Sequence, residues 1–554
     1  MTEKTRVGLL LTVAMLVYAN TLVNGFAFDD GIYIFGNHSV TSPSIQAMFA
    51  PTKFNNVVRP VTFATLALNQ AVGGAHPFGY HLFNLFLHAA VVLLLYMVLR
   101  RLLDTLPEGG AVSLMAALLF AVHPIHTEAV ASIVGRSEVL AAGFLLAAWL
   151  LHLQDREIPS LLCLALALMS KESAVAFVPL VLAGDFARSK FKPSGRYARI
   201  VGVAVVYLAL FWKIKGGRFG EVSIPFLDNP LANLPGSLRI LNSLRIAWKY
   251  VGLHVYPVKL SCDYSYNAIL LYANWRHGVV AASAALLVMA LWVWAFWTRR
   301  NEWFLAGAIY LGGFAATANL LVPTGTIMGE RLAYLPSAGF CLLVALALIR
   351  FERHQRLLGS AVFVILIAAL ALRTVDRNSD WRDNFRLFST DVRVVPGSAK
   401  IHCNLGGEYL RLGQLEAAQA ELQIALRIYP EFPEAQEFQG LVEARMGHGQ
   451  EARRSMEKAL SSIQTDDINY AFWEVNLAAE LIQLGQSEDA LKLLNQVLAQ
   501  SPDNARAWSN RAVIYYKRGE LTSARSDAEA ALRLEPSNGQ AQAVLNSLNL
   551  PPGL

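Results

Sequence analysis

Two adjacent carboxylates, Asp29 and Asp30, follow the first apolar stretch of the chain and are flanked by Phe28 and Gly31. They stand where a membrane helix would give way to water, and ionisable groups at that depth are costly and tend to mark substrate paths or chemistry. A carboxylate in this place could act as a general base on an attacking hydroxyl. Because Asp-Asp-Gly is also good turn chemistry, a solvated turn is the alternative reading of these residues alone.

Further along the chain, acids, histidines and a cation fall close together. His123, His126 and Glu128 lie within one short motif, and Arg136 and Glu138 follow shortly after it. We expect these residues at the ends of two helices, where they could converge on the aspartate pair. The arginine is the more telling member, because a guanidinium matches a phosphate through two parallel hydrogen bonds. A lone histidine here would more often be a helix-end or interface residue than a base.

Two more loops each add a cation beside an acid, Lys171 with Glu172 and Arg331 with Glu330. A set of acids with Arg and Lys on one membrane face suits a lipid-phosphate substrate. The cations would hold the anionic phosphate leaving group, and a carboxylate would take the proton of the attacking hydroxyl. For each residue taken singly, pairing that merely keeps short spans packed is the alternative; for the set we favour chemistry.

The elements that must position these residues are membrane helices. The chain has 554 residues, of which 55% are hydrophobic and 16% charged, and its mean hydropathy is +0.39. A soluble chain carries about 25% charged residues, and the deficit is concentrated in the long apolar runs before residue 375. We therefore predict an all-α chain: a polytopic membrane domain at 1–375, a linker at 376–397 and a soluble helical domain at 398–554.

The apolar runs indicate about eleven spans, the first of them uncleaved because no small-residue cleavage site follows it. The candidate spans are 7–24, 80–99, 111–123, 137–154, 158–169, 174–184, 199–213, 277–298, 303–321, 333–350 and 357–373. Short loops rich in Arg and Lys then all fall on the cytoplasmic side. The loops that carry the acids, the loop 214–276 and the C-terminal domain share the opposite face.

The net charge of +6 resides largely in those short loops, so it indicates membrane topology rather than nucleic-acid binding. No two of the cysteines, Cys163, Cys262, Cys341 and Cys403, have ligand spacing. The sequence therefore supports neither a disulfide framework nor a zinc site. A divalent metal stays open, without ligand spacing to place it.

From about residue 398 the pattern changes to a period of 34 residues, which is typical of a helical solenoid. Small and large residues recur at the positions of a tetratricopeptide repeat in about four copies, and a capping helix is expected at 539–550. The clearest copy contains Trp508, Ala512, Tyr515, Ala524, Ala528, Ala531 and Pro536. Such a solenoid presents a concave surface to a peptide or protein; a docking platform without a role in chemistry is the alternative.

Taken together, these motifs resemble the transmembrane and tetratricopeptide-repeat protein O-mannosyltransferases. The resemblance covers essentially the whole chain in matching order. Its motifs are His123 to Glu138, Met169 to Glu172, Asp228 to Asn233, Pro257 to Ser265, Gly329 to Ser337, and Trp381. The family resembles the GT-C glycosyltransferases, which are multi-spanning enzymes with an acidic first extracytoplasmic loop.

The resemblance implies transfer of a sugar, usually mannose, from a polyprenyl-phosphate donor to Ser or Thr hydroxyls of a protein. The catalytic acid would be Asp29 or Asp30, with a narrow preference for Asp30. The expected donor-phosphate ligands are Arg136, Lys171 and Arg331, and the expected supporting residues are His123, His126, Glu128, Glu138, Glu172 and Glu330. An inverting single displacement is expected, because no second nucleophilic carboxylate is evident.

The expected partners are the lipid-linked sugar donor, membrane lipid and a protein acceptor or partner at the repeats, without nucleic acid. We expect a bacterial inner-membrane protein, or an ER membrane protein in a eukaryote, with the repeats on the periplasmic or lumenal side. Two alternatives stay open. One is a transferase of the same fold that acts on a lipid-linked or cell-surface glycan, and the other is a non-catalytic membrane-anchored scaffold.

Overall fold

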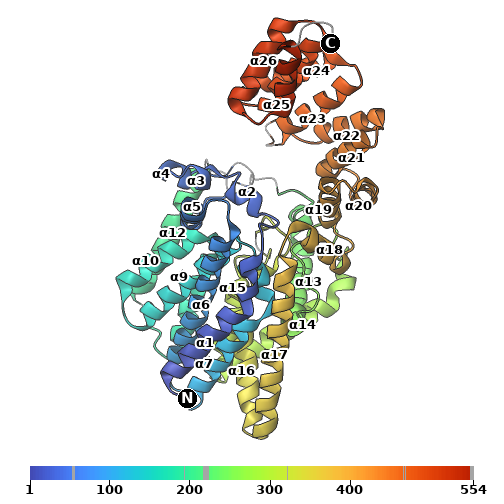
Figure 1. Ribbon diagram of the computed structural model, residues 1–554. Coiled ribbons are helices and arrows are strands. Elements are labelled where there is room, and N and C mark those ends of the chain that lie inside the picture. The colour runs from blue at the N-terminus through green and yellow to red at the C-terminus, as the bar shows by residue number, and fades with distance from the viewer. Residues whose placement is uncertain are drawn as a thin grey trace. The chain divides into compact units, whose positions relative to one another are not determined.

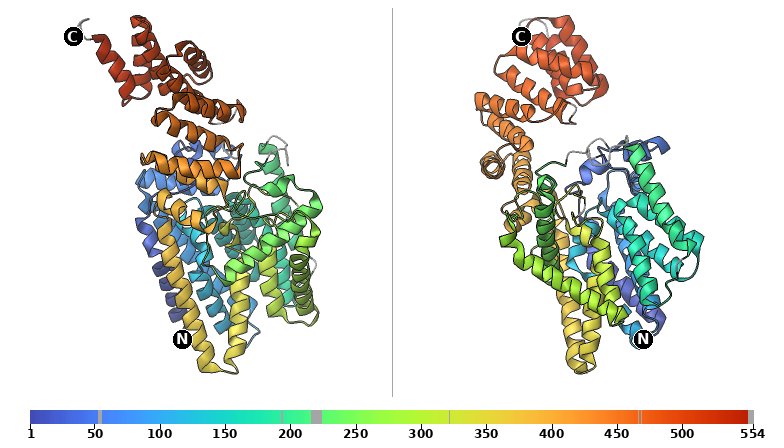
Figure 2. Two further views of the ribbon diagram at one scale, coloured as in Figure 1. Left: turned by 90° about the vertical axis from the view of Figure 1, so that its right-hand side faces the viewer. Right: turned by 180° about the vertical axis from the view of Figure 1, so that it is seen from behind.

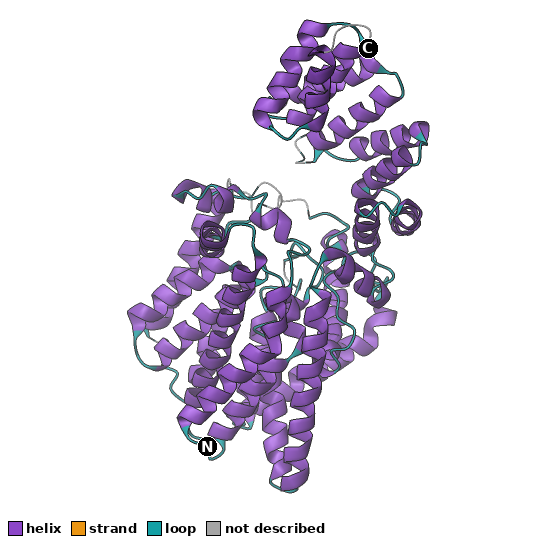
Figure 3. Cartoon of the chain, in the orientation of Figure 1, coloured by secondary structure: helices purple, strands orange, loops and turns teal. Residues whose placement is uncertain are grey.

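The computed structural model describes residues 1–52, 56–192, 194–215, 224–320, 322–465, 467 and 469–549. Part of the predicted loop 214–276, residue 321 of one predicted span and residue 550 of the predicted capping helix lie outside these ranges. The described residues form helices joined by loops, and no strand occurs among them (Figure 3). The all-α prediction is confirmed. The chain divides into two compact units, Met1–Ser398 and Ala399–Leu554, which are described separately here.

The first unit is a bundle of apolar helices whose ends carry short helices and loops (Figure 1). Its helices are α1 (Glu3–Tyr18), α2 (Asp30–Ile34), α3 (His38–Thr41), α4 (Ile45–Met48), α5 (Pro60–Gly73), α6 (Pro77–Leu102), α7 (Gly109–Val122), α8 (Thr127–Ala131), α9 (Arg136–Leu153), α10 (Glu157–Ser170), α11 (Phe177–Ala187), α12 (Gly195–Ile214), α13 (Gly236–Val255), α14 (Trp275–Trp297), α15 (Asn301–Phe314), α16 (Ser337–Glu352), α17 (Arg356–Asp380) and α18 (Asn384–Val394).

Each of the eleven predicted spans overlaps one of these helices, although the predicted span 303–321 continues beyond Phe314, where α15 ends. Within the described residues, six helical segments are long and apolar enough to cross a membrane, and a seventh is counted if α7 and α8, bent by 53°, form one span. The remaining segments, such as α11 with 11 residues, are shorter than the roughly 20 residues that a bilayer needs. The number of crossings and the side of each loop therefore stay predictions.

Helix α14 shows why these helices suit lipid. Val280 is 77% exposed and Leu286 is 71% exposed, although both are large and apolar. Such a surface would be unfavourable in water but matches hydrocarbon, where a helix also satisfies its own backbone polar groups. Inside the bundle, Trp149 of α9 is 1% exposed. A Cβ atom on Gly184 of α11 would lie 2.9 Å from the Trp149 ring, so the glycine makes room for the indole.

Two helices, α5 and α13, lie outside all the predicted spans. Helix α5 is too short and too polar for a membrane span, since it contains Thr62, Thr65 and Asn69. Helix α13 is strongly amphipathic and carries several cations, so it does not register as an apolar run. The predicted linker 376–397 holds the last turn of α17 and the whole of α18, and both belong to the first unit.

The second unit is an array of four helix pairs with a final helix, and successive helices stack side by side (Figure 2). The helices are α19 (Ala399–Arg411), α20 (Leu415–Ile428), α21 (Pro433–Arg445), α22 (Gly449–Ser461), α23 (Tyr470–Gln483), α24 (Ser487–Gln500), α25 (Ala505–Lys517), α26 (Leu521–Leu534) and α27 (Gly539–Asn549). A glycine with φ between 74° and 82° ends the first helix of every pair, at Gly413, Gly447, Gly485 and Gly519. Glycine suits this left-handed C-terminal turn because it has no Cβ.

Candidate functional site

Asp29, Glu128 and Arg331 come from three distant parts of the chain and meet at the ends of the helices. One guanidinium nitrogen of Arg331 lies 3.5 Å from Asp29 Oδ2 and 3.3 Å from Glu128 Oε1. The backbone N–H of Arg331 also donates to Glu128 Oε2 at 2.8 Å. The Glu128 side chain is 2% exposed, whereas those of Asp29 and Arg331 are 29% and 27% exposed. The buried Glu128 therefore holds Arg331 in place, whereas the side chains of Asp29 and Arg331 are partly exposed to solvent.

The neighbouring Asp30 has a different environment. It is fully buried, and it accepts hydrogen bonds from the backbone N–H groups of Ala27 and Val134, both at 3.1 Å. Burial raises the pKa of Asp30 to about 7, although these hydrogen bonds act in the opposite direction. Asp30 ties the first loop to the segment before α9. The geometry therefore favours Asp29 rather than Asp30 for contact with a substrate, against the narrow preference from the sequence.

Two further ion pairs extend the site. The Lys171 ammonium pairs with the Glu138 carboxylate, and both side chains are less than 10% exposed. The Arg59 guanidinium donates two hydrogen bonds to Glu172, at 3.2 Å and 2.8 Å. We call the set of seven side chains in these three groups the rim cluster; its members are Asp29, Arg59, Glu128, Glu138, Lys171, Glu172 and Arg331.

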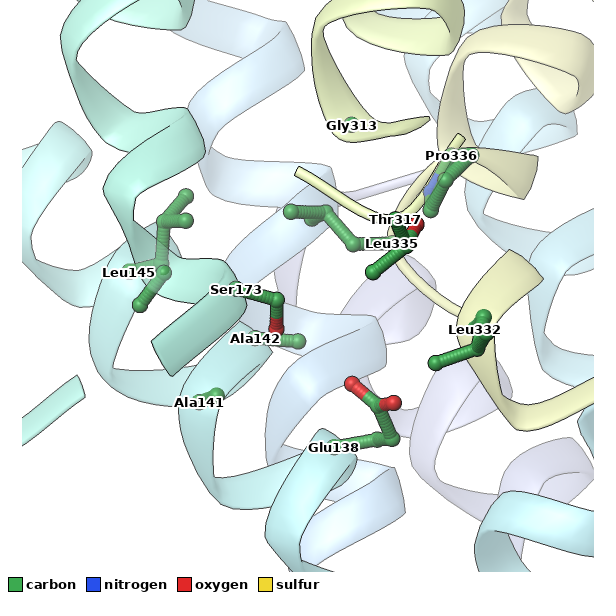
Figure 4. A pocket seen from close by; sticks show the side chains of 11 residues that line it. Glu138, Ala141, Ala142, Leu145, Ser173, Gly313, Thr317, Leu332, Leu335 and Pro336 are labelled. Carbon is green, nitrogen blue, oxygen red and sulfur yellow. The ribbon is translucent and has the colours of Figure 1, made fainter. Parts of the chain in front are cut away.

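A small pocket opens beside Glu138 of the rim cluster (Figure 4). The Glu138 carboxylate points into it, and Ser173 and Thr317 add two hydroxyl groups to its lining. The other lining residues are small or aliphatic: Ala141, Ala142, Leu145, Ala174, Gly313, Leu332, Leu335 and Pro336. The pocket therefore joins one charged group of the rim cluster to an apolar surface.

Arg136 does not join the rim cluster, and this corrects a prediction. Its side chain is fully buried at the start of α9. It donates to Asn84 Oδ1 at 2.7 Å, to the Thr65 carbonyl at 3.1 Å and to the Tyr80 carbonyl at 3.0 Å. Its guanidinium also lies 4.6 Å from the centre of the Phe83 ring. These contacts hold α5, α6 and α9 together and leave the guanidinium no path to a phosphate.

His123 and His126 also lie in the interior instead of at the rim. The His126 ring packs against Phe120 and Tyr334, with ring centres 4.3 Å and 4.8 Å away, and its Nε2 lies 2.6 Å from Ser337 Oγ. His123 Nε2 lies 3.0 Å from the carbonyl oxygen of His254. The rings of four histidines pack against one another here, and we call them the histidine cluster. Its members are His88, His123, His126 and His254. It serves packing between helices.

Glu330 precedes Arg331 in sequence but turns to the other side. It is 1% exposed, and the Ser261 N–H and the Tyr264 hydroxyl both donate to its Oε1 at 2.6 Å. Burial raises the pKa of Glu330 to about 8. Glu330 therefore holds the loop after α13 against the segment that carries Arg331, and it supports the site without facing it.

Sequence reasoning missed Arg59 and the buried pair Arg377–Asp391. Arg377 is fully buried and donates to both oxygens of Asp391, at 2.6 Å and 3.1 Å. The backbone N–H of Cys262 donates to the same carboxylate at 2.6 Å. The one sequence signal was a charged residue within or beside an apolar run. Among the described residues, no group of three or more His, Cys, Asp or Glu side chains is placed to hold a metal ion.

Comparisons with known proteins agree with the motifs. The family model described as "Tetratricopeptide repeat" matches residues 403–467 and 475–539. A protein O-mannosyl-transferase of Caenorhabditis elegans is 30% identical over 76% of this chain and 63% of its own length. Protein O-mannosyl-transferase TMTC3 of Mus musculus is 27% identical over 96% of this chain and 64% of its own length. The chain thus spans less than two thirds of these relatives.

Among solved structures, MamA from Desulfovibrio magneticus RS-1 is 26% identical over 27% of this chain and 83% of that chain, with a TM-score of 0.24. The resemblance seen in the motifs is confirmed by the curated relatives, which match most of the chain at 26% to 30% identity. The chain is thus similar over most of its length to proteins named protein O-mannosyl-transferases, and it carries tetratricopeptide repeats in its C-terminal part.

Proposed function

We propose that this protein is a membrane glycosyltransferase of the GT-C type that transfers mannose from a polyprenyl-phosphate donor to Ser or Thr hydroxyls of a protein. The observation that carries the proposal is the convergence of Asp29, Lys171 and Arg331 in one rim cluster, in a chain similar to proteins named protein O-mannosyl-transferases. A non-catalytic scaffold would not need acids and cations from separate loops to gather at one end of its helices.

Asp29 acts as the general base. Its carboxylate takes the proton of the acceptor hydroxyl while the hydroxyl oxygen forms a bond to the anomeric carbon of the sugar. The bond from that carbon to the phosphate oxygen breaks, and its electron pair leaves with the polyprenyl phosphate. This single displacement inverts the anomeric carbon. Arg331, 3.5 Å from Asp29, places a positive charge beside the carboxylate that receives this proton.

Arg331 and Lys171 stabilise the phosphate as it gains negative charge. Stabilisation of charge that develops in the transition state is usually the largest catalytic contribution, and Glu128 and Glu138 hold the two cations in place. Asp30, with both oxygens engaged, positions the first loop and keeps Asp29 next to Arg331.

The repeats recruit the protein acceptor or a partner, because solenoids of this kind offer a curved surface to protein chains. The site lies on the non-cytoplasmic side of a bacterial inner membrane or an ER membrane, as the distribution of Arg and Lys over the loops indicates. A transferase that instead elongates a lipid-linked or cell-surface glycan would use the same rim chemistry with another acceptor.

The test is a transfer assay in proteoliposomes with radiolabelled polyprenyl-phosphate mannose and Ser- or Thr-containing protein. With the wild-type protein, we expect the radiolabel on Ser or Thr hydroxyls of the acceptor protein. With Asp29→Asn, we expect the transfer rate to fall by at least about 100-fold. Mass spectrometry of envelope proteins with and without the gene separates the acceptors. If loss of the gene leaves hexose on envelope proteins unchanged but removes a surface glycan, the acceptor is that glycan and not a protein. A wild-type protein without transfer to either acceptor would refute it.

A further inference from the structure

The proposed mechanism leaves one ion pair of the rim cluster unused, and Arg59 is the cation of that pair. It stands directly before Pro60, the first residue of α5, so it comes from the first loop, as Asp29 does. Its side chain is 15% exposed, and its guanidinium forms a two-fold hydrogen bond with Glu172. A planar guanidinium in this geometry also fits two oxygens of a phosphate.

Three cations are crowded together at this point of the molecule. Burial lowers the pKa of the Lys171 ammonium, and both Arg59 and Arg331 lower it further, while Glu138 acts in the opposite direction. The geometry agrees, because Glu138, Ser173 and Leu332 line one pocket, which brings the segments of Lys171 and Arg331 together. Arg59 reaches the same place through its hydrogen bonds to Glu172, the residue after Lys171. These cations come together with four carboxylates, those of Asp29, Glu128, Glu138 and Glu172. A phosphate can therefore bind here only where it takes the place of one of these carboxylates.

Each cation is held by a carboxylate: Arg59 by Glu172, Lys171 by Glu138, and Arg331 by Glu128 and Asp29. The Glu172 side chain is 41% exposed, against 9% for Glu138 and 2% for Glu128. Of these three glutamates, Glu172 is thus the one whose carboxylate can most easily turn away from its cation into water. The exposed partner makes Arg59 the cation most easily released to an incoming anion.

A structural role for the Arg59–Glu172 pair is the competing explanation, since it links α5 to the turn after α10. That link already exists without the ion pair. The buried Thr62 hydroxyl donates to the carbonyl of Ser170 at 2.9 Å, and this contact joins α5 to the last residue of α10. The charged pair is therefore not required to hold these two segments together.

We propose that Arg59 is a third ligand of the donor phosphate, together with Lys171 and Arg331, and that Glu172 holds its guanidinium until the phosphate displaces it. The inference rests on the proposed function, because the phosphate is that of the lipid donor. It adds a contact from the first loop, so donor binding and the placement of Asp29 depend on the same segment.

The first experiment measures donor affinity in Arg59→Gln and Arg59→Lys. Binding of sugar-free polyprenyl phosphate to purified protein in nanodiscs gives a readout that needs no transfer, and the KM for donor gives a second. We expect Arg59→Gln to weaken both by about 10- to 100-fold, the range of a lost charge-assisted contact. Arg59→Lys keeps the charge but loses the planar two-fold contact, so it should fall between Arg59→Gln and wild type.

The second experiment decides between the two roles of the pair. If Glu172 only holds the Arg59 guanidinium until phosphate displaces it, Glu172→Gln should bind polyprenyl phosphate at least as tightly as wild type. The reason is that the competing carboxylate is gone. If the pair is structural, Glu172→Gln and Arg59→Gln should weaken binding alike. Arg156→Gln, at the opposite end of α10, is the matched control and should bind like wild type. Thermal unfolding of each variant checks that the fold is kept.

The outcomes separate the two proposals. Wild-type phosphate binding and donor KM in Arg59→Gln, with sugar transfer intact in the wild-type protein, would overturn the role of Arg59 alone. Equal weakening by Arg59→Gln and Glu172→Gln would also overturn it. If Arg59→Gln does not fold, Arg59→Lys and Glu172→Gln still carry the test through their opposite expected effects. A wild-type protein that neither binds polyprenyl phosphate nor transfers sugar would remove the proposed function itself.

Discussion

The rim cluster and the histidine cluster receive residues from the same short stretch of sequence, yet they are built differently. Glu128 and Glu138 go to the rim, where each holds a cation. His123, His126 and Arg136 go to the interior, where aromatic rings, hydroxyls and backbone carbonyls surround them. Polar residues from one short stretch are thus divided between the rim, where they pair with opposite charges, and the interior, where uncharged partners surround them.

The largest expected difference between the rim cluster and the buried interior is that between Arg331 and Arg136. Arg331→Gln should lower the transfer rate by about 100- to 1000-fold, because it removes charge stabilisation from the leaving phosphate. Its unfolding temperature should fall less than that of Arg136→Gln, because the Arg331 side chain is 27% exposed and its backbone N–H still donates to the buried Glu128.

Arg136→Gln should show the reverse pattern. Losing the guanidinium leaves Asn84 and two carbonyls without their buried donor, which costs about 3 kcal/mol or more in the free energy of unfolding. The rate per folded molecule should stay within a few-fold of wild type. Thermal unfolding in detergent, measured with the transfer rate, checks both variants. Equal loss of rate in the two folded variants would contradict the assignment of Arg136 to packing.

The histidine cluster offers the next test. His126→Ala removes a ring that packs against Phe120 and Tyr334 and lies next to Ser337 Oγ. The cavity should lower the free energy of unfolding by about 2–4 kcal/mol. The pH dependence of transfer should keep its shape, because His126 takes no part in proton transfer. If one limb of the pH–rate profile disappears in this variant, His126 takes part in proton transfer and the prediction is wrong.

Asp30 gives a pH-dependent prediction with a definite sign. Its pKa in the folded protein is raised to about 7 by burial, whereas an aspartate in an unfolded chain titrates near pH 4. Between these values the folded state holds the proton more tightly, so its stability should fall as pH rises, by at most about 1.4 kcal/mol per pH unit from this group.

The measurement is the unfolding temperature in detergent between pH 4 and pH 8. Asp30→Asn cannot titrate, and its profile should lose this slope over the same interval. An unchanged slope in the variant would show that Asp30 is not the group responsible.

The smallest effect is expected at Tyr264. Tyr264→Phe removes one of the two donors to Glu330 Oε1 and leaves the Ser261 N–H in place. The expected cost is about 1 kcal/mol in the free energy of unfolding, with a modest rise in the donor KM because Glu330 adjoins Arg331. Unfolding and kinetic measurements on this single variant check both numbers. A stronger effect on rate than that of Arg331→Gln would place the active centre closer to Glu330.

Most helices and the repeat array could be predicted from the sequence, because hydropathy and a fixed period are local signals. The repeats are set by alanines such as Ala418 and Ala528, both fully buried, and by a glycine that ends each first helix. Helix α5 escaped prediction because its threonines and Asn69 interrupt the apolar pattern. The position of Arg59, at the start of that helix, escaped with it.

The site could be predicted as a set of acids and cations but not residue by residue. Asp29 and Asp30 are neighbours with identical chemistry, and only the fold distinguishes them: Asp30 is fully buried, while 29% of the Asp29 side chain is exposed. Arg136 has the residue type of a phosphate ligand, but its partners, the carbonyls of Thr65 and Tyr80, are backbone atoms that sequence does not reveal.

The central claim is that Asp29, beside Arg331, performs the chemistry and that Asp30 positions it. The most direct measurement is kcat for mannose transfer by Asp29→Asn and Asp30→Asn, each purified in the folded state. The account predicts that Asp29→Asn loses at least about 100-fold in kcat, while folded Asp30→Asn stays within about 10-fold of wild type, as expected for a group that acts through backbone hydrogen bonds. Wild-type turnover by Asp29→Asn, or a deeper loss in Asp30→Asn, would contradict it.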